Sequence, residues 1–85
     1  MDEKTIILGQ SVEEMILTDG WKHVEAWIQR QKKQAANDLQ TKEFKELTAV
    51  KALQAKIKAL CELEAEIQHR INRGREARRK AERQE

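Results

Sequence analysis

Three side chains in this sequence belong to the types that most often act as nucleophiles or metal ligands: His23, His69 and Cys61. Two histidines without a neighbouring cysteine or a well-spaced carboxylate pair make a poor zinc site, so no metal is expected. The only cysteine cannot form an intramolecular disulfide. Its place in an apolar run predicts a buried thiol in a reducing compartment.

Three carboxylates follow at two-residue spacing: Glu62, Glu64 and Glu66. On a helix they point in different directions, because neighbours on a helix surface are three or four residues apart. They therefore do not form the paired carboxylates of acid–base catalysis. Glu64 falls on an apolar seam, and two interpretations stay open. It pairs with Lys22 or His23 and sets the helix register, or it lies at the edge of the seam with its carboxylate in water.

No motif in the sequence builds an active site. There is no Gly-rich phosphate loop, no His-Glu-x-x-His, no nucleophile elbow and no cysteine pair. Nothing in the pattern encloses a substrate. We therefore expect no enzymatic activity, no catalytic residues and no cofactor.

The composition predicts an all-α fold. Charged residues make up 38% of the 85-residue chain, aromatic residues only 4%, and proline is absent. Strong helix formers dominate. Through residues 43–73, apolar residues recur at alternating three- and four-residue steps, which is typical of a helix packed on another helix. This seam consists of Val50, Leu53, Ile57, Leu60, Ile67 and Ile71.

The first part of the chain predicts an arm followed by a short helix. Residues 1–10 read as irregular or briefly extended. Ser11 and Glu14 form a capping box that opens the short helix. Thr18 or Asp19 then caps the next helix.

The rest of the chain predicts an antiparallel, coiled-coil-like helical hairpin. One helix runs over residues 21–39, residues 40–42 form the turn, and the long helix runs over 44–71. Gly74 is a weak break in that helix. Beyond it we expect a basic helical extension that continues the helix, frays or becomes ordered on binding. The chain thus divides into an N-terminal arm (1–10), a hairpin domain (11–73) and a basic C-terminal tail (74–85).

Two helices cannot cover an apolar stripe from all sides, and further apolar positions flank the seam: Ala49, Ala52, Ala59, Cys61 and Leu63. We expect a dimer or larger ring formed through these flanks. The predicted interface residues are Trp21, Trp27, Leu53, Ile57, Leu60 and Ile67. The alternative is a monomeric hairpin with ordinary surface Leu and Ala residues.

The C-terminal end is basic. Residues 70–85 hold seven basic and three acidic residues, a net +4 within a total of +2. Candidate contacts to nucleic acid or another anion are Arg73, Arg75, Arg78, Arg79, Lys80 and Arg83. The alternative is a solvated helix end stabilised by Glu–Arg pairs. No apolar run is long enough to cross a membrane, and Ile6-Ile7-Leu8 is too short for a signal sequence.

The order of these parts resembles a group of small, mostly uncharacterised helical-hairpin proteins of tailed phages, encoded near head and DNA-packaging genes. The residues that carry the resemblance are 11–17 after Gly9, then Gly20-Trp21, Leu53-Gln54 with Ile57, and 71–74 with Ala77. The resemblance implies a phage origin and a structural or assembly context, with no catalytic residues. The basic end departs from the acidic tails of that group.

These observations predict a non-enzymatic phage protein that oligomerises and serves in head or packaging assembly. It would lie in the bacterial cytoplasm during infection or in the virion. The alternative is a small regulatory binder, either an inhibitor of a host protein or a sequence-independent nucleic-acid-binding accessory that uses the basic tail.

Overall fold

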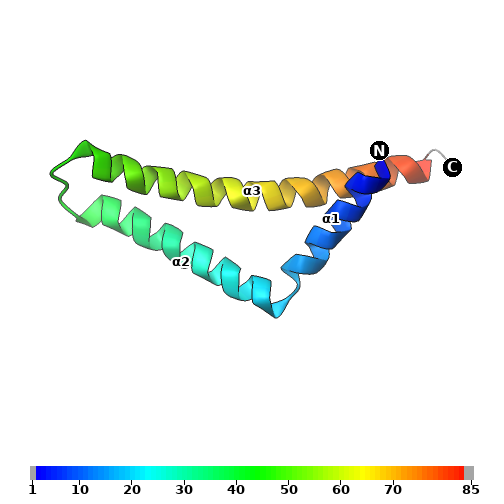
Figure 1. Cartoon of the computed structure of the whole chain (residues 1–85), viewed down its shortest axis with the longest axis horizontal. Helices are drawn as coiled ribbons and strands as arrows, with labels where there is room; N and C mark the ends of the chain where they lie inside the picture. Colours follow the sequence, from blue (N-terminus) through cyan, green and yellow to red (C-terminus); the bar gives the residue numbers. More distant parts are fainter. Residues whose placement is uncertain (1, 84–85) are drawn as a thin grey trace.

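The computed structural model describes residues 2–83 and confirms the all-α prediction. Three helices follow in chain order: α1 (Asp2–Ile16), α2 (Asp19–Thr41) and α3 (Leu47–Arg83). In Figure 1, α3 forms one long side, and α2 meets it at the 42–46 loop and diverges from it. From the far end of α2, α1 returns to the C-terminal part of α3. The three axes outline a triangle.

Residues 2–10 are helical, so the prediction of an irregular arm and of a helix start at Ser11 is wrong. Asp2 and Glu3 lie in the first turn of α1, where carboxylates favour a helix N-terminus. The residues on the inner side are partly or fully buried: Thr5, Gly9, Val12 and Ile16. Packing against α3 stabilises this helix, which tertiary contacts decide more often than local propensity does.

A two-residue turn joins α1 to α2, and one hydroxyl serves both helices. The Thr18 Oγ1 donates to the Met15 carbonyl at 2.7 Å and accepts from the Trp21 backbone N–H at 3.1 Å. Thr18 is thus the N-cap of α2, one of the two residues predicted for that role. A tight turn of this kind fixes the direction in which α2 leaves α1.

The connection between α2 and α3 is later than predicted. Thr41 is the last residue of α2 and donates its hydroxyl to the Asn37 carbonyl at 2.8 Å, so it does not cap α3. Phe44 lies half-buried in the loop, and α3 begins at Leu47. No Gly or Pro marks this boundary, so the usual sequence signals for the end of a helix are absent here.

Gly74 does not interrupt α3, which continues through it to Arg83, one of the three outcomes expected for this end of the chain. The glycine is needed for packing: a Cβ on Gly74 would lie 2.8 Å from the Gly9 Cα, and a Cβ on Gly9 would lie 3.0 Å from the Arg70 carbonyl oxygen. Real Cβ atoms essentially never show the first distance, and the second is tighter than nine in ten real Cβ contacts. α1 and α3 therefore cross in backbone contact at Gly9 and Gly74, because glycine has no Cβ to hold the two backbones apart.

The core is small and lies in two places. Ile28 and Ala35 are buried on α2, and Ile71 and Ala77 are buried on α3. These four are the buried apolar side chains among the described residues. The molecule measures 62 × 26 × 15 Å, close to the thickness of one layer of helices. A single layer leaves most apolar side chains with one face open to solvent.

The glycine crossing generates a first prediction. Gly74→Ala should lower the free energy of unfolding by about 1–2 kcal/mol, because overpacking exceeds the gain in helix propensity. Gly20→Ala is the control, since no atom lies within 4 Å of its Cβ position. It should leave stability unchanged or raise it by about 0.5 kcal/mol. Thermal unfolding followed by circular dichroism measures both, and equal stabilisation by the two variants would contradict the crossing.

The α2–α3 seam generates a second prediction. Ile57 is half-buried on α3, whereas Ala55 two residues earlier is exposed. Ile57→Asp should cost more than about 2 kcal/mol, because an unpaired charge enters an apolar contact. Ala55→Asp should cost well under half of that. Chemical denaturation of both variants gives the comparison, and equal midpoints would refute a folding role for the seam.

Candidate interaction surfaces

The residues predicted to form an oligomer interface fall into two groups. Most of them are half-buried against the neighbouring helices of the same chain: Trp21, Leu53, Ile57, Leu60 and Ile67. Trp27 remains 46% exposed. The structure therefore brings the seam of α3 against α2 and leaves Trp27 as the large member that faces solvent.

Polar bridges cross the α2–α3 contact on both sides of the seam. On one side, Lys32 Nζ donates to Glu64 Oε1 at 2.7 Å and Gln29 Nε2 donates to Glu64 Oε2 at 2.9 Å. On the other side, Lys56 Nζ donates to Gln31 Oε1 at 2.6 Å. The bridges lie on two sides because successive residues of a helix are rotated by about 100°. This rotation places Lys32 and Gln31 on opposite flanks of Ile28.

Glu64 does pair across the seam, but the predicted partners were wrong. Lys22 and His23 lie on the exposed side of α2, whereas Lys32 lies on the side that faces α3. Side chains on a helix lean toward its own N-terminus. In antiparallel helices, long side chains therefore meet partners diagonally across the contact, as Lys32 and Glu64 do.

This pair shifts both titrations. The hydrogen bond from Lys32 lowers the pKa of Glu64 below its ordinary 4.5, more than partial burial raises it. The same hydrogen bond raises the pKa of Lys32 above its ordinary 10.5. The charged forms of both groups thus favour the folded state, so the pair stabilises the α2–α3 contact at neutral pH.

An apolar patch lies on the flank that the Gln31–Lys56 bridge crosses. Val24 and Trp27 precede Gln31 by two turns and one turn on α2, and Leu63 follows Lys56 by two turns on α3. Val24 is 41% exposed, Trp27 46% and Leu63 45%. Leu63 was recognised from the sequence as a flanking position. Val24 is exposed because α2 and α3 diverge along their length (Figure 1).

A cleft opens where the three helices meet. Its volume is about 220 Å³, and five apolar and three polar side chains line it. Its lining residues are Ile16, Trp21, Glu25, Ile28, Glu64, Ile67, Gln68 and Ile71. Glu64 is already engaged by Lys32 and Gln29.

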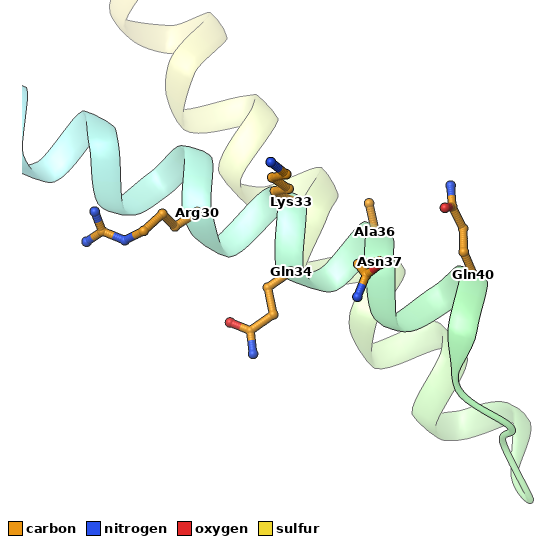
Figure 2. A pocket seen from close by; sticks show the side chains of 6 residues that line it. All are labelled: Arg30, Lys33, Gln34, Ala36, Asn37 and Gln40. Carbon is orange, nitrogen blue, oxygen red and sulfur yellow. The ribbon is translucent and has the colours of Figure 1, made fainter.

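A second hollow, of about 480 Å³, lies on the outer side of α2. Figure 2 shows its six lining side chains, which all come from this one helix and are spread along it, with α3 behind the helix. No second element closes over them. This surface therefore does not converge on a ligand.

The basic candidates belong to α3 and do not form a separate tail. Arg75 Nε lies 3.0 Å from Glu13 Oε1 and so links α3 to α1. Lys80 pairs with Glu76 at 3.5 Å, one turn away. The other basic candidates, Arg73, Arg78, Arg79 and Arg83, are exposed along the same helix. A continuous basic helix end can contact an extended anionic surface but carries no base-reading module.

The candidates for chemistry are dispersed. Cys61 is exposed, so the predicted burial of this thiol is wrong, because α2 covers only one face of α3. His23 and His69 are exposed on different helices. Within residues 2–83, no three His, Cys, Asp or Glu side chains group closely enough to hold a metal ion. No helix in that range is both long and apolar enough to span a bilayer.

Comparison with known proteins yields no significant match to any protein family, curated protein or solved structure. The fold and surfaces define a three-helix, all-α chain with a thin core and two exposed surfaces of contrasting chemistry, one apolar and one basic.

The Lys32–Glu64 pair generates a third prediction. Because the folded-state pKa of Glu64 is lowered, its contribution is present above pH 4.5 and disappears as the pH falls through the folded value. Glu64→Gln removes this titration, so the variant should lose less stability than the native chain between neutral and acid pH. Glu62→Gln, on an exposed carboxylate nearby, is the control. Melting temperatures measured across this range give the slopes, and parallel curves for native chain and Glu64→Gln would contradict the pairing.

Proposed function

We propose that this chain is a non-enzymatic, self-associating helical protein of phage type that serves as a structural or assembly component, associated with the head or with packaging. The observation that supports self-association is that the described part of the chain buries fewer large apolar side chains than it exposes. Among residues 2–83, four apolar side chains are buried, whereas eight large ones are more than a third exposed. An isolated chain pays for folding mainly with buried apolar surface.

The exposed area supports the same conclusion. The chain exposes 7000 Å², whereas a compact monomer of 10.0 kDa exposes about 5,200 Å². The excess of roughly 1,800 Å² exceeds the ~800 Å² that each partner buries in a standard protein interface. Part of it follows from the elongated shape, and that shape offers a long side for lateral contact.

The phage context rests on the resemblance of the residues in the order described above. An assembly role fits an elongated molecule with an apolar side and a basic end, because one surface can join copies while the other contacts an anionic partner.

The alternative is a regulatory binder that uses the basic end of α3 for nucleic acid or the apolar flank for a host protein. The observation that favours it is that residues 74–83 are helical and continuous with α3. Their basic side chains are thus held along one axis. Contacts of this kind would be sequence-independent and strongly salt-dependent.

Light scattering of the full chain over a range of concentrations, at low and high salt, tests the proposal. We expect an oligomer that persists at high salt, because apolar contacts are not screened. The companion variant is Arg79→Gln/Arg83→Gln; truncation after Arg73 is unsuitable because Gly74 and Ala77 pack against α1. This variant should assemble as the native chain does. A monomer under all conditions would overturn self-association, and DNA binding that the double substitution abolishes would favour the alternative.

A further inference from the structure

α3 carries a second heptad-like stripe, separate from the seam that packs on α2. Its members follow at steps of four, three, four, three and four residues, and all are exposed: Ala52, Lys56, Ala59, Leu63, Glu66 and Arg70. At about 100° per residue, this stripe lies roughly a third of a turn around α3 from the seam. It is the flank on which Lys56 bridges to Gln31 and near which Trp27 is exposed. The stripe ends at Arg70, where α1 begins to cover α3.

The stripe is complementary to the same stripe on a second copy of α3 that runs antiparallel to it. If two copies of α3 run antiparallel with residue 61 at the centre, Ala59 of one faces Leu63 of the other, and Lys56 faces Glu66. Each contact then occurs twice, as a two-fold interface requires. The small Ala59 makes room for the large Leu63, and opposite charges lie across from each other rather than like charges.

We propose that a second copy of this chain binds the stripe of α3, in a two-fold antiparallel pairing flanked by Trp27 of each copy. This inference rests on the proposed self-association and assigns it a surface, a partner and a register. The stripe spans about 27 Å of helix. A contact of this length would also include Trp27 and Val24 from α2. The area that the chain exposes beyond that of a compact monomer is larger than the area each partner buries in a standard dimer interface.

The existing ion pairs are compatible with this pairing. Glu66 Oε1 holds Arg70 Nε at 2.5 Å within the chain, and both side chains are about half exposed. The second carboxylate oxygen of Glu66 can accept from Lys56 of the other copy. Because Cys61 lies on the other flank of α3, beside Lys32, the two Cys61 thiols do not meet and the native thiol does not stabilise the dimer.

The first test is association. Leu63→Glu should weaken the dimer about tenfold or more, since it places a charge in the centre of the interface. Ala65→Glu, two residues away on an exposed position outside the stripe, should leave it unchanged. Sedimentation equilibrium measures both, with circular dichroism to confirm folding. A Leu63→Glu chain that dimerises like the native chain overturns this surface and leaves the proposed function standing, whereas a monomeric native chain overturns both.

The second test is the register, and it does not depend on Leu63→Glu being folded. In a Cys61→Ser background, Ala59→Cys and Leu63→Cys are prepared singly, with tags of different size. The mixture should form a disulfide heterodimer faster than either variant alone, because only residues 59 and 63 of opposite copies come within bonding distance. Ala59→Cys mixed with Ala65→Cys is the control. Cross-linking that is no faster in the first mixture than in the control or the single variants overturns the antiparallel pairing.

Discussion

The backbone contact between Gly9 and Gly74 is the constraint on which the arrangement of the helices depends. It lets α1 lie against α3 without an intervening layer of side chains, and that approach covers Ile71 and Ala77. The two-residue turn at Thr18 then fixes where α2 starts. At its N-terminal end, α2 is separated from α3 by the central cleft. It contacts α3 only in its C-terminal part, so the three axes enclose a triangle (Figure 1).

A triangle of single helices has little interior, and this accounts for the surfaces of the molecule. The α2–α3 contact combines partly covered apolar side chains with polar bridges from Gln29, Lys32 and Lys56. Such bridges define the pairing of helices more than they add stability, because they are partly exposed. The apolar flank beside them is left uncovered. Self-association would complete a core that one chain only begins, as oligomers often do for small domains.

Part of this fold was predictable from the sequence, for identifiable physical reasons. Helical propensity and the period of the seam predict helices, and a capping residue at Thr18 or Asp19 predicts the start of α2. Only the second part of α1 was predicted. Residues 2–10 were missed because Gly9 looks like the end of an extended segment when its contact with Gly74 is unknown. Gly74 was interpreted as a weak break for the same reason. A glycine that permits close packing and one that ends a helix look identical in one sequence. The partner of Glu64 was missed because its side chain meets Lys32 diagonally, which depends on tertiary placement.

A nuclear Overhauser measurement between glycine α-protons tests the glycine crossing most directly. The chain has three glycines, so a sample labelled with ¹³C at glycine alone gives few signals, and Gly20 lies far from any close contact. The structure predicts a cross-peak between the α-protons of Gly9 and Gly74 and none from Gly20 to either. A spectrum in which all three glycines are assigned and no Gly9–Gly74 cross-peak appears would contradict the crossing and the arrangement built on it.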